Sequence, residues 1–459
     1  MNNQVRIMKM TFTLLIASIT IMVVPGMSQA QTIQQGLQKQ IPQVIDYLNQ
    51  RQLKTVGVLK FRVKKPGEKI TASAGALNSL LADRLEVGLI LANPFDEARQ
   101  LNIIKDASAQ AAELKDADHL TEAGRQVFFG PEFKLAWGKE KKAADAFLTG
   151  IVLVHDDNQR ASVGILCFVK ANGKLERACE VFDVDLDAES IGGIGESFFL
   201  RGAFDGGSTQ LSFNDQQKQK QQQILSTAAR VKKQQDTFPL MDAAAPVKLE
   251  IFYDGRKVPV TMKDGQAFVA EPEEGQKVEM ALIRNSSAKG RLGIVLKVNG
   301  ENTLYRQVKR DLDCNKWILS PDHTRTVVKG YQMEDDNTAE QFQVLSEAES
   351  ARRAMDYGRH TGQIQMTVFQ ELQQAKPQPT ILNEDEQDLV AMLRGVQPEE
   401  QPANLGALKS QIRLAGKKQP ETRGGLIVQG AQTDNKVKTV KFQADPTPIM
   451  SVTITYYRP

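Results

Sequence analysis

Three aspartates at alternate positions, Asp183, Asp185 and Asp187, are the cluster that comes closest to a metal-binding pattern. Carboxylates with this spacing begin a calcium loop, which also needs a glycine for its sharp turn and a glutamate at its twelfth position. Ala188 stands where the glycine is required, and Ile194 stands at the twelfth position. On a strand the three carboxylates would lie on one face, so we favour a solvated sheet edge and expect no metal.

A glycine-rich stretch follows at residues 191–196, with the sequence Ile-Gly-Gly-Ile-Gly-Glu. It could hold a phosphate, but no Gly-Lys-Ser/Thr comes after it and the glycines lack the spacing of a dinucleotide fingerprint. The overlapping residues 195–199, Gly-Glu-Ser-Phe-Phe, lack the second glycine of a nucleophile elbow. A hinge is the favoured interpretation, and no cofactor is expected.

The histidines and aromatic residues give no clearer site. None of the four histidines has a second ligand at metal-binding spacing, and the pair His155-Asp156 falls in a turn, where surface polarity is favoured over acid and base chemistry. Five large aromatic residues could stack on a sugar but are scattered, so core packing is favoured for each. The histidines are His119, His155, His323 and His360, and the aromatic residues are Trp137, Tyr253, Tyr305, Trp317 and Tyr331. We therefore predict no catalytic residue.

The three cysteines, Cys167, Cys179 and Cys314, are few for an exported chain of 459 residues, so stability must come from packing. Cys167 and Cys179 lie on the two arms of a hairpin that turns at Asn172-Gly173. A strict two-residue turn sets Cys167 opposite Ala178, and a one-residue bulge would join the two sulfurs in a disulfide. Two small buried side chains are the favoured alternative, and Cys314 stays unpaired in both cases.

The elements that position these residues centre on residues 146–184, which we expect to form a three-strand meander. The apolar run at residues 151–154 suits a strand with both faces covered, and residues 155–158 form a turn. A second strand spans residues 161–169, and Asn172-Gly173 returns the chain through residues 175–184.

The preceding residues predict helices that alternate with strands. The spacing of apolar residues indicates each element, and a proline such as Pro94 marks where a helix ends. Pro42 is expected to start or kink the second part of the first helix. These elements are a helix at 31–52, a strand at 55–63, a helix at 72–92, a short strand at 101–105, a mostly helical segment at 105–126 and an irregular stretch at 127–142. Their order predicts an α/β sandwich with a mixed sheet.

From residue 247 apolar residues recur at every second position, which is typical of strands and predicts a mostly antiparallel β-sandwich. The expected fold class of the whole chain is therefore α+β. We place one helix at 385–393 within a stretch rich in glutamine, proline and glutamate. The expected strands are 247–253, 256–263, 277–284, 291–298, 303–308, 316–319, 324–329, 340–345, 363–369, 426–429, 436–442 and 449–457. The expected domains are an α/β domain (31–190), a flexible glutamine-rich linker (191–240), the sandwich (241–371), a low-complexity insertion (372–423) and closing strands (424–459).

The first thirty residues predict export. Arg6 and Lys9 precede an apolar run at residues 11–24, and Ser28-Gln-Ala30 has the small residues of a signal-peptidase site, so we expect a signal peptide at 1–30. An uncleaved anchor is the alternative, but the run is short for a membrane span. The formal net charge of +3 is too balanced to indicate a nucleic acid partner. We expect a periplasmic or secreted protein with no integral membrane span after cleavage.

One resemblance to known proteins supports this predicted cellular location. The strand Val56-Gly-Val-Leu-Lys-Phe61, the helix containing Leu80-Leu-Ala-Asp-Arg-Leu85 and the strand entry Ala144-Asp-Ala-Phe-Leu-Thr-Gly-Ile151 resemble a domain shared by the TolB amino terminus, the curli secretion lipoprotein and the flagellar lipoprotein FlgO. The resemblance covers about residues 45 to 185, and the chain lacks the lipid-accepting cysteine of the lipoproteins. It implies an envelope protein that binds other proteins or assembles. A carbohydrate-binding accessory protein is the alternative function, with a glycan as its partner.

Overall fold

The structure, a computed structural model, is an α+β fold, which confirms the fold class expected from the sequence. It describes residues 31–114, 116–200, 213–233, 238–263, 266–308, 310–333, 337–344, 362–372, 402–414 and 427–456. The expected signal peptide, the helix expected at 385–393 and His360 lie outside these residues.

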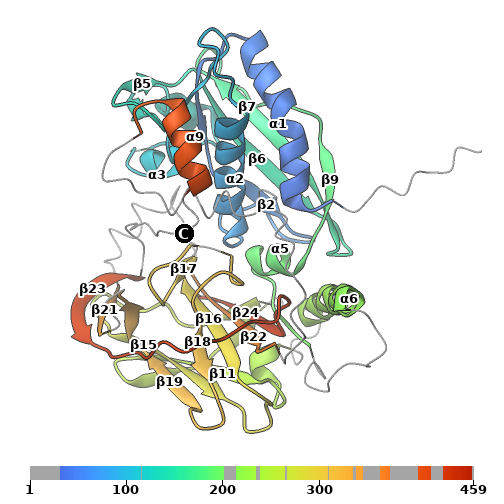
Figure 1. Ribbon diagram of the computed structural model, residues 1–459, viewed down its shortest axis with the longest axis vertical. Coiled ribbons are helices and arrows are strands. Elements are labelled where there is room, and N and C mark those ends of the chain that lie inside the picture. The colour runs from blue at the N-terminus through green and yellow to red at the C-terminus, as the bar shows by residue number, and fades with distance from the viewer. Residues whose placement is uncertain are drawn as a thin grey trace, which may run out of the picture. The chain divides into compact units, whose positions relative to one another are not determined.

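A mixed sheet of seven strands forms the centre of the N-terminal half (Figure 1). β1 runs parallel to β3 and β6, β2 is also parallel to β6, and β7 is antiparallel to β6, β8 and β9. The strands are β1 (Thr55–Val58), β2 (Arg62–Lys64), β3 (Asn102–Ile103), β6 (Ala146–Val154), β7 (Arg160–Val169), β8 (Glu176–Arg177) and β9 (Phe182–Asp185). The meander expected at residues 146–184 is confirmed, except that its third strand is divided into β8 and β9.

Two long helices pack on one face of this sheet. α1 (Ile33–Gln50) and α2 (Leu77–Ala92) pack on it, and Thr32 closes the start of α1 with a capping box. Pro42 lies inside α1, which continues through it. The apolar stripe expected for this helix is buried as predicted, since Ile33, Leu37, Ile41, Ile45 and Leu48 all belong to the core.

The opposite face is covered only in part. α3 (Ala107–Ala111), α4 (Glu122–Val127) and the small sheet of β4 (Glu132–Lys134) and β5 (Lys141–Ala143) pack over Phe147 and Phe168. Farther along β6 the cover ends, and Leu153 is 43% exposed while Val152 and Val154 are buried. The expectation that both faces of the run at 151–154 are covered is therefore wrong, because the covering layer does not reach this end of the strand.

Two expected elements are shortened by contacts that are distant in sequence. The strand expected at 55–63 is interrupted at Lys60, whose backbone N–H donates to Ser108 Oγ and whose carbonyl accepts from Thr149 Oγ1. The helix expected from residue 72 begins at Leu77, because Thr71 forms backbone hydrogen bonds with Val63. Side chains thus replace regular ladder bonds at Lys60, and backbone bonds to Val63 occupy Thr71 ahead of the helix.

The helix expected over 105–126 is mostly absent, since only the short helices α3 and α4 form there. Asp106 and Asp116 have positive φ, which breaks a helix. The buried Arg125 donates to the carbonyl of His119 at 2.9 Å and also to that of Gly173, so the segment is held by a buried guanidinium.

His119 gives this segment a testable pH dependence. Burial and the positive charges of Arg62, Lys60 and Arg125 lower the pKa of His119 to about 3. An unfolded chain takes up this proton near pH 6.5, so stability is lost as the pH falls from there toward 3, by about 3 kcal/mol at pH 4.

We expect His119→Gln to reduce the difference in unfolding free energy between pH 7 and pH 4 by about that amount, measured by urea denaturation. His323→Gln, at an exposed turn, is the control and should leave the difference unchanged. An equal difference in the native protein and in His119→Gln would contradict this prediction.

Two further sheets form the C-terminal half. The first sheet is mixed and has eight strands, of which six follow the order β13-β14-β24-β22-β16-β17. The second sheet is antiparallel and has seven strands, of which five follow the order β12-β11-β15-β21-β20. The first comprises β10 (Phe198–Phe199), β13 (Thr261–Lys263), β14 (Gln266–Phe268), β16 (Leu292–Val298), β17 (Glu301–Asn302), β18 (Trp317–Leu319), β22 (Gln363–Gln370) and β24 (Met450–Thr455). The second comprises β11 (Val247–Tyr253), β12 (Arg256–Val258), β15 (Val278–Arg284), β19 (Arg325–Val328), β20 (Gly330–Gln332), β21 (Thr338–Val344) and β23 (Ile427–Asp434). Apolar residues from both sheets belong to one core cluster.

Most strands expected in this half are confirmed, and three are not as predicted. The strand expected at 256–263 is divided at Pro259 into β12 and β13, which pair in different sheets, because proline has no N–H for a ladder. Residues 303–308 turn instead of extending, since Tyr305 and Arg306 both have positive φ. Residues 436–442 are extended chain without strand pairing.

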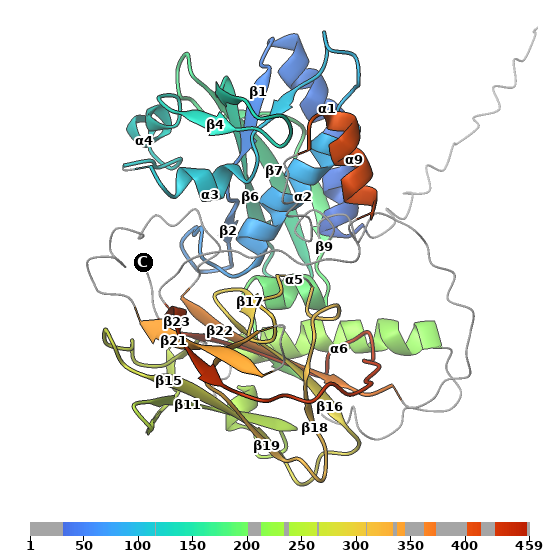
Figure 2. The ribbon, with the colours of Figure 1, turned by 60° about the vertical axis from the view of Figure 1, so that its left-hand side comes forward.

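Among the described residues, two helices connect the halves of the chain, and a third packs from one half onto the other. α5 (Ala188–Gly193) begins in the expected α/β domain and ends in the expected linker, and α6 (Phe213–Lys233) lies within that linker. α9 (Leu405–Leu414) lies between β22 and β23 of the C-terminal half in sequence, yet it packs beside α2 (Figure 2), where Lys409 Nζ donates to the carbonyl of Asn93 at 2.6 Å. The described residues from 31 onward form one compact unit.

Candidate functional site

A groove of about 800 Å³ lies on the C-terminal half, between β18, β19 and the extended residues 435–442, which we call the strap. β18 pairs with β16 in one sheet, whereas β19 pairs with β15 in the other. The turn between Ser320 and His323 joins the two strands, so they diverge toward different sheets. The strap crosses this divergence, and the space beneath it is the groove.

The strap is fixed at both ends. At its start, Asn435 donates its backbone N–H to the carbonyl of Asn337 and its side-chain Nδ2 to Gln332 Oε1, while Gln332 Nε2 donates to the carbonyl of Asn435. At its end the Phe442 ring lies over Gly293, where an added Cβ would come within 2.5 Å of the ring. The residues between these anchors are mostly exposed, and Val440 is 43% exposed.

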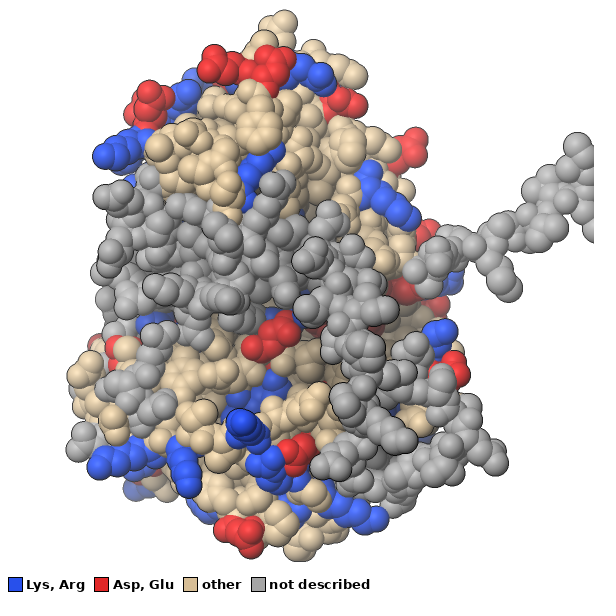
Figure 3. Space-filling model, in the orientation of Figure 1, with Lys and Arg blue, Asp and Glu red and all other residues tan. Residues whose placement is uncertain are grey.

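The groove is lined by basic side chains. Among the described residues that line it are five lysines or arginines and no acidic residue, and these are Arg291, Lys316, Arg325, Lys436 and Lys438. Figure 3 shows several Lys and Arg side chains, with some Asp and Glu among them, on the lower part of the molecule in this view. Arg291 is paired with Glu371, but within the described part of the chain no carboxylate pairs with Arg325, Lys436 or Lys438.

Lys316 lies deeper in the groove. Its Nζ donates to the carbonyls of Leu312 and Cys314 at 2.6 and 2.8 Å, and it lies over the ring of Phe369. Burial lowers the pKa of Lys316 below its ordinary value. An anionic group entering the groove would offset that effect of burial and would favour the charged lysine.

Aromatic side chains form another part of the wall. Trp317 is 8% exposed and donates its indole N–H to Thr303 Oγ1 at 2.9 Å, while Tyr305 is half-buried. Tyr305 and Arg306 have φ values of 59° and 52°, which cost about 1 kcal/mol or more each in a residue with a side chain. The ion pair between Arg306 and Glu301, at 3.1 Å, helps hold this turn and so helps fix Tyr305 at the groove.

The geometry suits the binding of an extended anionic chain. β18 has a strand neighbour on one edge only, among the residues described, and its other side faces the groove. An extended segment can add to such an edge through backbone hydrogen bonds, while unpaired cations bind its acidic side chains. The groove itself was not predicted from the sequence, but it brings together Tyr305 and Trp317, two of the scattered aromatic residues considered for sugar stacking. The strap also carries Lys436, Lys438 and Lys441 with no acidic residue among them.

The aspartates and His155 singled out in the sequence lie elsewhere. Asp183 and Asp185 lie on β9, and Asp183 Oδ1 accepts from Ser162 Oγ, which is 2.9 Å from His155 Nε2. This order places serine between histidine and aspartate, whereas a catalytic triad places histidine in the middle. Within the residues that the structure describes, no three His, Cys, Asp or Glu side chains are placed to hold a metal ion.

The glycine-rich stretch forms α5 and the turn after it. Asp187 caps α5 by accepting from the N–H of Ser190 at 2.8 Å, and Gly192 lines a second cavity. Glu196 pairs with Lys65 at 3.1 Å, and Ser197 Oγ accepts from the N–H of Thr453. Neither residue is therefore arranged as part of a nucleophile elbow.

The cysteines are all free thiols in the structure. Cys167 is opposite Glu176 instead of Ala178, because the connection between the strands is longer than a two-residue turn. This register shifts Cys179 away from the position that a one-residue bulge would give it. Burial raises the pKa of Cys167 to about 12, as expected for a small buried side chain.

The described residues form an α+β fold whose C-terminal half carries a groove lined by basic side chains. In the part of the chain that the structure covers, every helix is too short or too polar to span a membrane. Comparisons with protein-family models, curated proteins and solved structures found no match to this chain.

Proposed function

We propose that this chain is an exported, non-enzymatic protein of the cell envelope, periplasmic or secreted, that binds an acidic, extended segment of a partner protein in the groove under the strap. The observation that carries the proposal is a groove lined by five basic residues and by no acidic residue among those described. The export signal expected at residues 1–30 and the resemblance of residues 45–185 to envelope proteins support the location.

The arrangement of the C-terminal sheets belongs to the same proposal. We propose that they pack face to face as a β-sandwich, which the shared core cluster of the two sheets supports. β18 and β19 then mark the side where the two sheets diverge, and the strap spans it. A sandwich gives the groove a rigid base, since β16, next to β18, is buried at every position.

Site-specific photo-crosslinking tests the proposal in the cells that make the protein. A photoreactive amino acid replaces Val440 on the strap or, as the matched control, Leu153 on β6, since both side chains are 43% exposed. We expect Val440 to give an adduct with a defined protein through an acidic segment, and we expect Leu153 to give no such adduct.

Charge reversal at the groove completes this test. The double variant Lys436→Glu and Lys438→Glu should reduce the Val440 adduct at least tenfold, because like charges now oppose the partner. High salt should reduce it as well. No adduct from Val440, or an adduct that is unchanged in the double variant, would contradict the proposed function.

Binding of an acidic glycan is the second candidate function. The observation that favours it is the aromatic part of the wall, since Tyr305, Trp317 and Phe442 all line the groove and sugar rings pack on aromatic faces. A Val440 adduct that contains saccharide and no peptide would favour this function over the first.

A further inference from the structure

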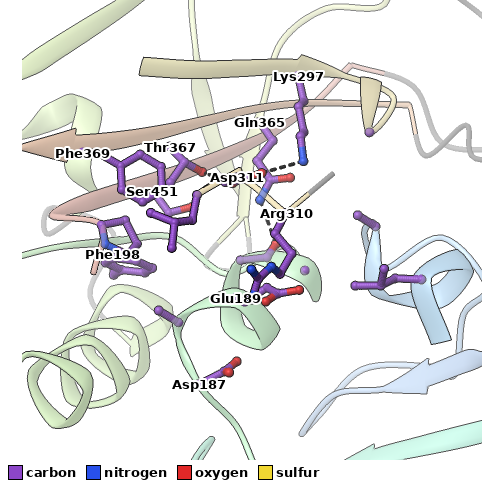
Figure 4. Close-up of a pocket in the computed structure, with 18 of the residues that line it drawn as sticks. Asp187, Glu189, Phe198, Lys297, Arg310, Asp311, Gln365, Thr367, Phe369 and Ser451 are labelled. Atoms are coloured by element: carbon purple, nitrogen blue, oxygen red, sulfur yellow. Dashed lines mark hydrogen bonds and ion pairs between the residues drawn. The ribbon is translucent and has the colours of Figure 1, made fainter. Parts of the chain in front are cut away.

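A second cavity, of about 210 Å³, lies between helices of the N-terminal half and the sheet of β16, β22 and β24 (Figure 4). α2 and α5 border it on the helical side, and α6 contributes Gln221. Pockets for drug-sized ligands measure roughly 300 to 1,000 Å³. This cavity therefore suits a smaller molecule with a single ring.

Each charged side chain of the cavity already has a compensating partner. Lys297 Nζ lies 2.6 Å from Asp311 Oδ1, and Asp311 Oδ2 also accepts from Thr367 Oγ1. Glu189 Oε1 pairs with Arg84 at 2.7 Å, on the helical side of the cavity.

The two remaining charged residues follow the same rule. Arg310 Nε pairs with Asp313 at 2.7 Å, and Asp187 caps the N-terminus of α5. A charged ligand would find no unpaired group of opposite charge in the lining, and burial of an unpaired charge is unfavourable. The charges of the cavity thus favour a neutral ligand.

Two hydroxyl groups in the lining remain without a hydrogen-bond partner among the described residues. Ser451 Oγ, on β24, belongs to a residue that is only 2% exposed, and Ser79 Oγ, on α2, is also buried. Both residues line the cavity, one from the sheet side and one from the helical side. A buried hydroxyl without a partner is unfavourable, and a serine side chain that turns its hydroxyl toward the cavity gains a hydrogen bond from a ligand there.

Acceptors and ring faces complete the lining. Among the described residues, Glu189 uses Oε1 in its ion pair with Arg84, and Gln365 uses Nε2 to donate to the carbonyl of Gly192 at 3.1 Å. Glu189 Oε2 and Gln365 Oε1 can therefore accept from ligand hydroxyls. Phe198 and Phe369 supply apolar surface for the ring itself (Figure 4).

We propose that this cavity binds a neutral, polyhydroxylated molecule of single-ring size. Its hydroxyl groups bind Ser79, Ser451 and the free acceptor oxygens, and its ring packs against Phe198 and Phe369. This site is separate from the basic groove, and its ligand differs in charge and size from the acidic segment proposed there.

A panel of matched probes tests the proposal by saturation-transfer NMR on the full chain. The neutral probes are glucose, galactose, mannose and myo-inositol, and glucosamine and glucuronate place a positive or a negative charge on the same type of ring. We expect at least one neutral probe to bind with a dissociation constant of about 1 mM or tighter. The charged probes should bind at least tenfold more weakly than the best neutral one.

Variants place the binding in the cavity. Ser451→Ala removes one unpartnered hydroxyl and should weaken the best probe about fivefold, while the midpoint of thermal unfolding stays constant or rises by about 1 to 2 °C. Ser79→Met should abolish binding by filling the space from the helical side. Ser287→Ala is the control, because Ser287 is exposed and its Oγ is already bound to Asn285.

Three results would overturn the proposal. They are the absence of binding by every neutral probe, equal binding of charged and neutral rings, and unchanged affinity in both Ser451→Ala and Ser79→Met. The result for Ser451→Ala separates a ligand site from a purely structural one, since a structural role would change stability and leave probe affinity unaffected.

Discussion

Replacing Phe147 with alanine is expected to lower the free energy of unfolding by about 3 to 5 kcal/mol. Phe147 is fully buried on β6. Its ring centroid lies 5.2 to 5.7 Å from those of four other rings, Phe128, Phe129, Phe133 and Phe168. Phe128 and Phe129 also contact Phe168, at 5.9 and 5.8 Å. Removal of the central ring leaves a cavity and breaks the aromatic contacts that attach the covering layer to the sheet.

Urea denaturation measures this loss, with Phe95→Ala as the matched control. Phe95 is 67% exposed, so its removal should cost less than about 1 kcal/mol. A loss below about 1 kcal/mol for Phe147→Ala would show that the aromatic cluster does not hold this face of the sheet.

The second large effect is expected for Glu196→Gln, which should cost about 3 kcal/mol. Lys65 and Glu196 form an ion pair at 3.1 Å, and their side chains are only 6% and 9% exposed. Burial alone would lower the pKa of Lys65, but the carboxylates of Glu196 and Glu68 hold it above its ordinary value. Neutralising Glu196 therefore leaves a buried ammonium with weaker compensation.

Glu140→Gln provides the comparison for this ion pair. Glu140 pairs with Lys142 at the surface, where the side chains are 76% and 40% exposed, and such pairs contribute little. We expect denaturant midpoints to differ clearly between the two variants. Equal, small losses in both would contradict a structural role for the Lys65–Glu196 pair, which joins the end of β2 to the approach to β10.

Local signals made much of the fold predictable. The turn at His155 to Asn158 and the apolar pattern around it predict the hairpin of β6 and β7, because both signals lie within the hairpin itself. The helix α1 is predicted by its stripe of buried residues, and β24 by its alternation. In each case neighbouring residues carry the information.

Contacts between distant residues account for most of what the sequence did not reveal. The break at Lys60 depends on Ser108 and Thr149, and nothing near Lys60 in the sequence signals it. The position of α9 beside α2 depends on Lys409 reaching Asn93, which is likewise a contact between remote segments. Such contacts exist only once the chain has folded, so no local pattern predicts them.

The candidate site was unpredictable for the same reason. Arg291, Lys316, Arg325 and Lys436 come from four separate segments, and each segment alone resembles an ordinary polar surface. The basic composition of the strap and the aromatic residues Tyr305 and Trp317 were the signals in the sequence. They became informative only when the structure placed them around one groove, at the divergence of β18 and β19.

The most direct test of the proposed function is a fluorescence anisotropy titration of the purified protein with four labelled ligands of similar length. These are an acidic peptide, a neutral peptide, a basic peptide and a sulfated oligosaccharide. We expect the acidic peptide to bind most tightly, to weaken at least tenfold between 50 and 500 mM salt, and to lose binding in the variant with Lys436→Glu and Lys438→Glu. Tighter binding of the sulfated oligosaccharide, or acidic-peptide affinity that is the same in that variant, would contradict an acidic protein segment as the ligand of the groove.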